Sequence, residues 1–509
     1  MSRSSGVNSP HQGADTELAG SKVESGSSGD SAAGNNLVES RAKGRRVDLT
    51  QGPKLRRLVA IAWPLFVGNI LNTFYNLADM YWVARVGTDA VAAVAITFPT
   101  VWLTFSFGLG VTIAGVAFVS QLTGAKQVDS AARMAGQVVL MSAAVGALLG
   151  GLGILFRMPI LALLGASGET LRMASVYLAI VLSALPFNYI YFAYRAVSQG
   201  SGDAKTPRNL LVFTTLLSAA LDPPLVLGWG FFPAWGVAGA AWATWFAQLL
   251  GAVISLAYLM RGRLGVRLRF AHFKPDFASL RRIAAVGLPS SLEMGSRGLT
   301  SVVTAGIVSR FGTVEAAAYG IVMRVMSVVW TSSGAMEQAA ASAVGQNLGA
   351  KKPERAEQMA WTGAGVMFLF LSSIALLLYV FAEGIMRFFG VSDEVVATGV
   401  RFMRLHVFSY GFWGAMEVLQ GAFRGAGDTF PPAALTFLSR WAVHIPFSIW
   451  TSYYLGWGAD GTWIMMMISY TLFSVVTAVW FKMGRWKRGL LGRPEKAPAS
   501  RQEQPVSSE

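Results

Sequence analysis

An aspartate in the middle of an apolar run is the first residue of this sequence that needs a chemical explanation. Asp79 lies in the stretch NTFYNLADMYWV, inside a run that extends from Leu58 to Val86. An ionised carboxylate is costly inside a bilayer and is usually retained there for a functional reason. At 3.6 residues per turn, one helix face carries Asp79 together with Asn69, Asn72, Thr73 and Asn76, and Tyr75 lies at its edge. This face is predicted to line water or another helix.

A second acid, Asp222, lies on one helix face with Thr214 and Ser218. Two prolines, Pro223 and Pro224, follow it directly. Proline has no backbone N–H to donate, so the helix is predicted to bend beside the acid. Bent helices that line a cavity are common where transporters bind ions.

These acids allow a structural and a functional interpretation. A lone Asn or Ser in a membrane helix most simply hydrogen-bonds to a neighbouring helix. For Asp the functional interpretation is favoured, because an ionised carboxylate is costly inside a bilayer. A carboxyl group takes up a proton in apolar surroundings and releases it in polar ones. One charge that crosses the membrane potential is worth about 2.3 kcal/mol per 100 mV. We therefore predict that Asp79 acts as a proton switch, with Asp222 as the second acid.

Three further acids, Glu293, Glu337 and Glu417, lie in apolar segments of the second half of the chain. Arg297 follows Glu293 by one helical turn, a favourable order for an ion pair on a helix. That pair fits internal neutralisation and substrate contact equally well. Three other arginines are candidates to neutralise Glu337 or Glu417, namely Arg195, Arg324 and Arg440.

The elements that must hold these residues are membrane helices. The chain has 509 residues, of which 53% are hydrophobic and 14% charged. Reading each apolar stretch of about 20 residues as one span, we predict twelve transmembrane helices, which start near residues 58, 90, 134, 173, 209, 236, 283, 315, 359, 400, 433 and 461. The fold class is therefore an all-α, multi-pass membrane protein.

Composition excludes several kinds of site. Cysteine is absent, so there is no disulfide, thiolate metal site or cysteine nucleophile. The four histidines, at positions 11, 272, 406 and 444, are too scattered to indicate a metal cluster. A net charge of +15 is compatible with nucleic-acid binding, but the basic residues collect in particular loops. We therefore expect no metal, no resident cofactor and no nucleic-acid partner.

The distribution of basic residues predicts the orientation. Seven Lys and Arg residues lie in the connection between the sixth and seventh spans, and more follow the last span. The opposite connections GWGFFPAWG (228–236) and LGWGADG (455–461) contain none. The positive-inside rule then places both termini in the cytoplasm, which predicts a multi-pass protein of the cytoplasmic (inner) membrane.

The two halves of the chain are repeats. A shift of 225 positions lays LRRLVAIAWP (55–64) on LRRIAAVGLP (280–289) and SQLTGAKQVDSAARMA (120–135) on GQNLGAKKPERAEQMA (345–360). Because each half has an even number of spans, the two copies share one orientation, an arrangement in which transporters bind substrate between halves that rock. The predicted parts are a disordered cytoplasmic tail (1–48), a first lobe (49–260), a basic cytoplasmic linker (261–282), a second lobe (283–486) and a cytoplasmic tail (487–509).

The same repeat bears on an enzymatic motif. The stretch GSGD, which ends at Asp203, resembles the Gly-x-Gly-Asp signature of intramembrane aspartyl proteases. The equivalent GAGD ends at Asp428, and proline follows soon after each. Gly and Asp at these positions are typical of turns, so we favour a turn and predict that the protein is not an enzyme.

The chain resembles the multidrug and toxic compound extrusion (MATE) transporters of the MOP superfamily, in particular their prokaryotic DinF-like branch, from about residue 55 to 485. The resemblance rests on YNLADMYWVARVGTDAVAAV (75–94), GQNLGAKKPERA (345–356), RGAGDTFPP (424–432) and LDPPLVLG (221–228). It implies twelve helices in two pseudo-symmetric six-helix lobes and an exporter that exchanges protons or sodium ions for amphipathic, often cationic, compounds. It also implies an ion-coupling site of Asp79, Asp222 and Tyr75, to which the polar helix faces add Asn76 and Ser218.

Departures from the family pattern bear on the coupling ion. The family favours asparagine at Ser218 and a hydroxyl residue at Ala240. Loss of two oxygen ligands weakens a sodium site more than a proton site, so protons are favoured. Other branches place an acid near Trp413, whereas here Glu417 lies one turn further on and Glu293 one turn earlier than expected. The first-lobe loop has Gln199 where the second has Arg424.

The sequence thus predicts a proton-coupled drug exporter, a monomer whose partners are amphipathic small molecules and the lipid bilayer. One alternative is a lipid-linked oligosaccharide flippase of the same superfamily, and another is an intramembrane aspartyl protease. Acids in the first lobe favour a cationic cargo over the pyrophosphate of a flippase substrate. No drug-binding residues follow from the many aromatic and methionine side chains.

Overall fold

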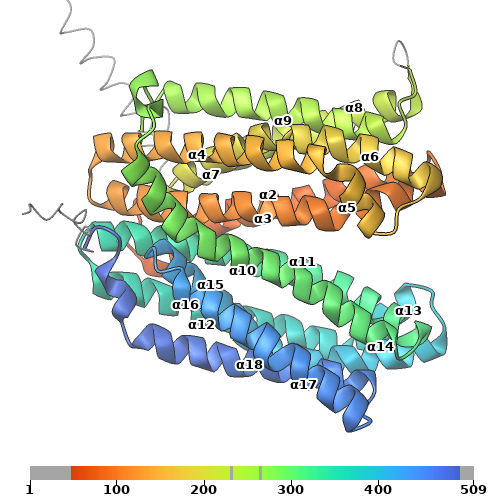
Figure 1. Cartoon of the computed structure of the whole chain (residues 1–509). Helices are drawn as coiled ribbons and strands as arrows, with labels where there is room; N and C mark the ends of the chain where they lie inside the picture. The colour runs from red at the N-terminus through yellow and green to blue at the C-terminus, as the bar shows by residue number, and fades with distance from the viewer. Residues whose placement is uncertain (1–46, 230–232, 263–265, 493–509) are drawn as a thin grey trace, which may run out of the picture.

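Two helical bundles make up this computed structural model, which describes residues 47–229, 233–262 and 266–492, with the backbone alone at residues 76, 77 and 328. Most of the predicted tails lies outside these residues. Figure 1 shows one bundle above the other. No strand occurs in the described part of the chain, and the predicted all-α fold is confirmed.

The first bundle contains six helical passages. They are α2 (Lys54–Ala84), α3 (Thr88–Gly124), α4 (Val128–Leu155), α6 (Gly168–Ser183) with α7 (Leu185–Gly200), α8 (Lys205–Leu227) and α9 (Val237–Met260). The short α5 (Arg157–Leu163) connects α4 to α6. The pair α6–α7 is bent by 43° and forms one broken passage. The helix α8 is continuous through Pro223 and Pro224, and the bend expected there stays a prediction.

The second bundle repeats this order. Its passages are α10 (Phe277–Ser309), α11 (Thr313–Gly349), α12 (Pro353–Val380), α14 (Asp393–His406) with α15 (Tyr410–Gly425), α16 (Phe430–Phe437) with α17 (Ile445–Ile449), and α18 (Ala459–Lys482). The short α13 (Ala382–Phe388) corresponds to α5. Wide π-helical turns, η3 (Leu438–His444) and η4 (Trp450–Tyr454), flank α17, so the counterpart of α8 is irregular.

Length and apolarity alone identify fewer passages than the fold contains. Among the described residues, eight helices are long and apolar enough to cross a membrane, and the bent pair α6–α7 adds a ninth. The other three, α10, α14–α15 and α16–α17, belong to the second lobe. Two of them carry charged residues in their interior, Glu293 and Arg297 in α10 and Glu417 and Arg424 in α15. Charge lowers their mean hydropathy without changing their place in the bundle.

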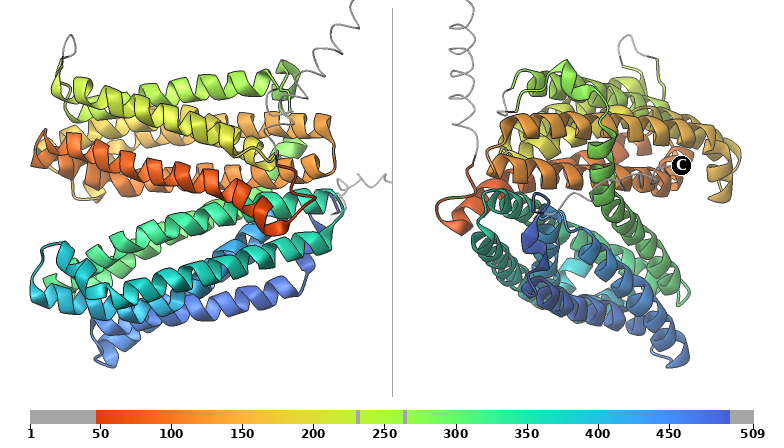
Figure 2. Two further views of the ribbon diagram at one scale, coloured as in Figure 1. Left: turned by 180° about the vertical axis from the view of Figure 1, so that it is seen from behind. Right: turned by 60° about the vertical axis from the view of Figure 1, so that its left-hand side comes forward.

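The lobes meet at one end and diverge at the other. The first and last described residues lie at the same end of the molecule (Figure 2), where the bundles are in contact, and the ribbons separate towards α5 and α13. The contact depends on small residues. A Cβ atom on Gly124 would lie 1.9 Å from the Gln346 carbonyl oxygen, and one on its repeat counterpart Gly349 would lie 1.8 Å from that of Gln121. The ends of α3 and α11 therefore cross in backbone contact.

Residues next to the predicted tails close the same end. The Leu49 N–H donates to Gln346 Oε1 at 3.3 Å, and the Leu490 N–H donates to Gln121 Oε1 at 2.7 Å. Val47 donates to the Gly202 carbonyl at 3.0 Å. Each terminal segment thus joins the two bundles, and we call this set of contacts the lobe latch.

Candidate functional site

The two first-lobe acids lie near each other between α2 and α8. Asp222 is completely buried and Asp79 is half-buried. Their carboxyl groups are near enough to interact electrostatically. Helical spacing places Ser218 one turn before Asp222 and Tyr75 one turn before Asp79, so the four side chains converge where α2 packs against α8.

Tyr75 is the hydrogen-bonding centre of this group. Its hydroxyl lies 2.7 Å from Ser218 Oγ and 3.0 Å from Thr244 Oγ1, and in each contact either oxygen can donate. Tyr75 therefore joins α2 to both α8 and α9. Both acids also act electrostatically on Tyr75 and on Tyr177 of α6. Four helices consequently contribute to the surroundings of the carboxyl pair.

Sequence reasoning missed Thr244 and Tyr177. Thr244 follows Ala240 by four residues, so the two positions share one face of α9. The hydroxyl that the family pattern places at position 240 is supplied one turn later in this chain. A search of α9 for hydroxyl residues in register with Ala240 would have found it. No comparable signal in α6 singles out Tyr177.

Parts of the predicted polar stripes do not join the site. Thr73 is exposed and donates to the Asn69 carbonyl of its own helix, and Asn72 is also exposed. Thr214 donates to backbone carbonyls within α8. Asn76 belongs to α2, but its side chain lies outside the described part of the structure. The site is thus concentrated within about one turn of each acid.

Neither carboxyl oxygen of Asp222 has a hydrogen-bond partner among the side chains and backbone groups that the structure describes, and the same holds for Asp79 Oδ1. A buried carboxylate without partners is unstable, because its lost hydration is not replaced. A charge at this position therefore requires a compensating proton or cation. This is the chemistry expected of an ion-coupling group.

The second-lobe acids form a separate network with two arginines. Arg297 donates to Glu417 at 2.7 Å, to Glu293 at 2.9 Å and to Gln420 at 2.8 Å. Arg424 donates to Glu293 at 2.6 Å and also pairs with Glu337. Helices α10, α11 and α15 are thus joined by alternating charges, and the pair of Arg297 with Glu293 is an internal one.

The expectation that Arg195, Arg324 or Arg440 neutralises these acids was wrong. Arg195 donates to Gln338 at 3.1 Å, Arg324 is exposed, and Arg440 lies over the Tyr470 ring. Arg424 was singled out only as a difference from Gln199. It is 2% exposed and sits between two carboxylates, which a single sequence does not reveal.

Asp203 has a structural role in this fold. Its carboxylate accepts hydrogen bonds from the backbone N–H groups of Lys205 and Thr206, both at 3.0 Å, and from the Thr206 hydroxyl. These bonds satisfy donors at the start of α8, where a helix leaves them without internal partners. The preceding Gly202 has a φ of 86°, as the turn requires.

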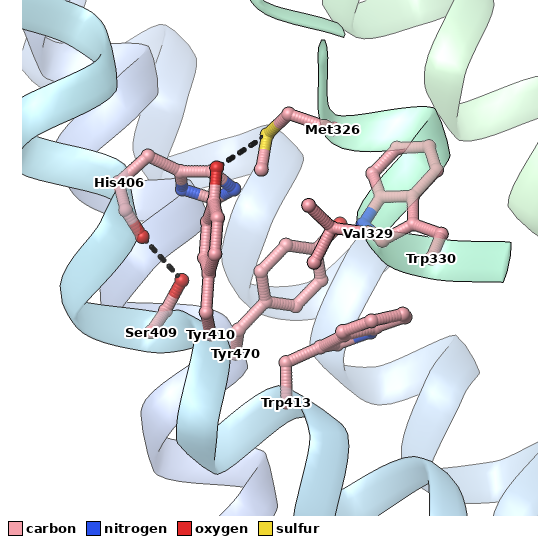
Figure 3. A pocket seen from close by; sticks show the side chains of 8 residues that line it. All are labelled: Met326, Val329, Trp330, His406, Ser409, Tyr410, Trp413 and Tyr470. Atoms are coloured by element: carbon pink, nitrogen blue, oxygen red, sulfur yellow. Dashed lines mark hydrogen bonds between the residues drawn. The ribbon is translucent and has the colours of Figure 1, made fainter. Parts of the chain in front are cut away.

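An aromatic cluster in the second lobe surrounds a small cavity. Figure 3 shows that Trp330, Trp413, Tyr410 and Tyr470 point towards one another beside His406. The enclosed space is about 10 Å³, roughly what a single water molecule needs. In this arrangement the cluster is packed protein core, and it has no room for an amphipathic substrate.

Comparison with known proteins identifies the family. The MatE family model matches residues 64–223 and again residues 289–450, once in each repeat and over more than half of the chain. The chain belongs to the MatE family. This result agrees with the resemblance to MATE transporters that the sequence motifs indicated, but it does not test the assignment to the DinF-like branch.

Curated relatives of this MatE protein carry transporter names. It is 28% identical over 405 residues to the probable multidrug resistance protein YoeA of Bacillus subtilis, which covers 79% of this chain and 88% of that protein. It is 25% identical over 443 residues to the probable multidrug resistance protein NorM of Thermotoga maritima, at 87% and 95% coverage. A FAD transporter of Shewanella oneidensis is 26% identical over 353 residues, at 69% and 78% coverage. The MatE protein is accordingly a transporter and not an enzyme.

Solved structures support the fold. A MOP superfamily transporter from Pyrococcus furiosus matches with a TM-score of 0.81 at 22% identity, covering 87% of this chain and 98% of that one. The Vibrio cholerae MATE transporter VcmN matches with a TM-score of 0.78 at 21% identity, at 88% and 98% coverage. The MatE protein therefore has the MATE fold, and its described residues form twelve helical passages in two pseudo-symmetric lobes.

Proposed function

We propose that this MatE protein is a proton-coupled antiporter that exports amphipathic, often cationic, compounds across the cytoplasmic membrane by alternating access. The observation that carries the proposal is Asp222, a fully buried carboxyl group without a hydrogen-bond partner among the described residues, next to Asp79 and the hydroxyl group of Tyr75. The names of the relatives support a drug as cargo.

Coupling would act through the helices that meet at Tyr75. Protonation of Asp79 or Asp222 removes a charge and adds a hydrogen-bond donor, so the contacts among α2, α8 and α9 must rearrange. A proton shifts a two-state equilibrium only by the difference in its affinity for the two states. A carboxyl that is buried in one arrangement and hydrated in the other provides such a difference. Release of the proton towards the cytoplasm then restores the binding-competent arrangement.

A proton fits the site better than a sodium ion. The hydroxyl oxygens of Ser218 and Thr244 are both engaged with Tyr75, and Ala240 contributes no oxygen. A sodium ion requires several oxygen ligands, whereas a proton requires one carboxylate.

The first lobe favours a cationic cargo over a lipid-linked pyrophosphate. The carboxyl pair of Asp79 and Asp222 carries no basic partner among the described residues, so the charge available to a ligand here is negative. The acids and arginines of the second-lobe network largely pair with one another. The flippase alternative is therefore not favoured.

Transport by purified protein in liposomes tests this function. A pH gradient and a sodium gradient would be imposed separately, with a fluorescent lipophilic cation as cargo. We expect the pH gradient to drive transport and Asp79→Asn to abolish that coupling while the protein remains folded and inserted. Asp129→Asn, an exposed change in the first turn of α4, is the matched control. Full pH-driven activity of Asp79→Asn would refute the proposal.

A further inference from the structure

A second cavity lies away from both acidic sites, at the end of the molecule where the termini meet. It is a partly open pocket of about 370 Å³ between α3, α4, the linker around η1 (Phe270–Phe273) and the first turns of α10. Leu491 of the C-terminal segment also lines it. The cavity is far larger than the space of about 10 Å³ in the aromatic cluster.

The floor of this cavity is a fixed structure. The buried Gln137 amide donates to the carbonyls of His272 and Lys274 at 2.9 and 2.8 Å, and its oxygen accepts from the Asp276 N–H at 2.9 Å. A Cβ atom on Gly136 would lie 2.4 Å from the His272 carbonyl oxygen, so the linker packs directly on the backbone of α4. Three hydrogen bonds and this close contact hold the linker residues in place.

The charge in the cavity is predominantly positive. Arg133, Lys274 and Arg282 line it from three different segments, and within the described residues none of them forms an ion pair. The one acid in the lining, Asp276, accepts hydrogen bonds from the Ala278 N–H and the Ser279 hydroxyl and so caps α10. The Ser279 hydroxyl in particular lowers the pKa of Asp276, and the charge of Arg282 also contributes. Among the described residues, three cations and one carboxylate therefore line the cavity, and the carboxylate is held in its own helix cap.

The same cavity also has apolar lining residues. Phe118, Leu122 and Met134 are buried in the lobe core beneath it, whereas Leu491 is 42% exposed, and the Arg282 guanidinium lies over the Phe118 ring at 5.4 Å. A free inorganic anion would leave the exposed Leu491 side chain without a partner. A molecule with an anionic phosphate and an apolar portion matches both surfaces, and basic pockets at the cytoplasmic ends of membrane helices suit lipid headgroups.

We propose that this cavity binds the phosphate-bearing headgroup of an anionic phospholipid. Its place at the cytoplasmic leaflet rests on the proposed function and on the predicted orientation with both termini in the cytoplasm, whereas the binding chemistry depends only on the cavity. A lipid held there would contact α4, the linker between the lobes and the C-terminal segment that joins the lobe latch. Nothing in the ion-coupling site is needed for this binding.

Native mass spectrometry of the detergent-solubilised protein, titrated separately with phosphatidylglycerol, phosphatidylcholine and inorganic phosphate, tests the proposal. We expect phosphatidylglycerol to bind tightest and Arg133→Gln/Arg282→Gln to weaken it by tenfold or more. The control Arg56→Gln/Arg281→Gln removes the same charge from exposed residues that do not line the cavity and is expected to leave binding unchanged. The binding of phosphatidylglycerol to Lys274→Gln, a single change in an exposed loop residue that lines the cavity, is measured as well and is expected to be weaker than in the wild type.

Each other outcome has a defined meaning. Equal loss in both double variants, or no loss in either, would overturn the site. Equal binding of the two lipids would overturn its preference for an anionic headgroup. Inorganic phosphate that binds as tightly as phosphatidylglycerol would assign the cavity to a free phosphate and refute the lipid. Because no transport is measured, failure of this proposal is distinct from failure of the antiport mechanism.

Discussion

Gln121 and Gln346 occupy equivalent positions in the two repeats, and each donates its side-chain amide to the carbonyl of the glycine that ends a helix of the opposite lobe, Gly425 of α15 and Gly200 of α7. Gln121 Nε2 lies 3.0 Å from the Gly425 carbonyl oxygen, and Gln346 Nε2 lies 2.9 Å from that of Gly200. Each side-chain oxygen accepts a backbone N–H from a terminal segment. The glutamine contacts of the lobe latch are therefore paired between the two repeats, and they stabilise the arrangement in which the terminal ends of the lobes meet.

Loss of one half of the latch should shift the molecule towards the opposite arrangement. Gln346→Leu removes two hydrogen bonds, each worth about 1 kcal/mol net. We expect the distance between spin labels at the terminal ends of the two lobes to increase in a larger fraction of molecules. The absence of native cysteine makes such labelling specific. Gln358→Leu on the exposed face of α12 is the control. An unchanged distance distribution in Gln346→Leu would contradict the role of the latch.

A methyl group at the crossing should have a stronger effect. The Cβ atom of Gly349→Ala would lie 1.8 Å from the Gln121 carbonyl oxygen, a distance that requires the helices to separate. We expect this variant to be depleted in the terminal-closed arrangement and to transport at less than about a tenth of the wild-type rate. Gly365→Ala places its Cβ in open space and should transport normally. Wild-type transport by Gly349→Ala would show that the crossing opens at no cost.

Thr244 should matter through its hydroxyl. Thr244→Val keeps the shape but removes one of the two hydrogen-bond partners of Tyr75, which costs about 1 kcal/mol. We expect the pH at which transport is half-maximal to move, because Tyr75 lies beside both acids. Thr244→Ser keeps the oxygen and is expected to retain the wild-type pH profile. Identical profiles in all three proteins would remove Thr244 from the site.

Single changes in the charge network of the second lobe should destabilise the protein, and a double change should restore much of the lost stability. Arg424→Gln leaves Glu293 and Glu337 short of a positive partner, and Glu337→Thr leaves Arg424 with one acid fewer. Breaking a buried ion pair on one side costs about 3–5 kcal/mol. The double variant copies the first-lobe residues Thr112 and Gln199 and should recover much of this loss. Thermal unfolding in detergent provides the measurement, and additive losses would argue against direct coupling.

The terminal segment should loosen in acid. Burial alone would raise the pKa of Asp48, but hydrogen bonds from Thr50 and the charges of Arg57 and Lys352 outweigh it and lower the pKa below 3.8. A lowered pKa means that the stabilisation is present above pH 3.8 and is lost as the pH falls through the lowered value. We expect the terminal segment to lose less than about 1 kcal/mol of stabilisation over that range. A spin label at Gln51→Cys should therefore become more mobile as the pH falls. Asp48→Asn should abolish this pH dependence.

Most of the fold follows from the sequence because hydrophobic length and repetition are local signals. The predicted start of each passage lies within or close to the corresponding helix, even for α10 and α15, whose internal charges lower their hydropathy. The internal repeat could be recognised for the same reason, since aligning the two halves with a shift of 225 positions requires no knowledge of how the helices pack. The bend predicted at Pro223 stays a prediction, since α8 is continuous there.

The site is only partly predictable because its partners come from distant helices. Asp79 and Asp222 are visible as acids in apolar runs, and Tyr75 and Ser218 follow from helical spacing. Thr244 enters only because α9 packs beside α2, and Arg424 reaches Glu293 across 131 positions of the chain. Charge complementarity alone offers several arginines for each acid, and the geometry of the bundle selects among them.

The bond between Leu490 and Gln121 has a consequence for biosynthesis. These residues are 369 positions apart, so a ribosome makes the whole second bundle before the Gln121 oxygen receives its partner. Until Leu490 has been made, the Gln121 oxygen lacks this partner. The inter-lobe contact can therefore be completed only after translation of the second bundle, and a nascent protein that stops short of Leu490 lacks this hydrogen bond.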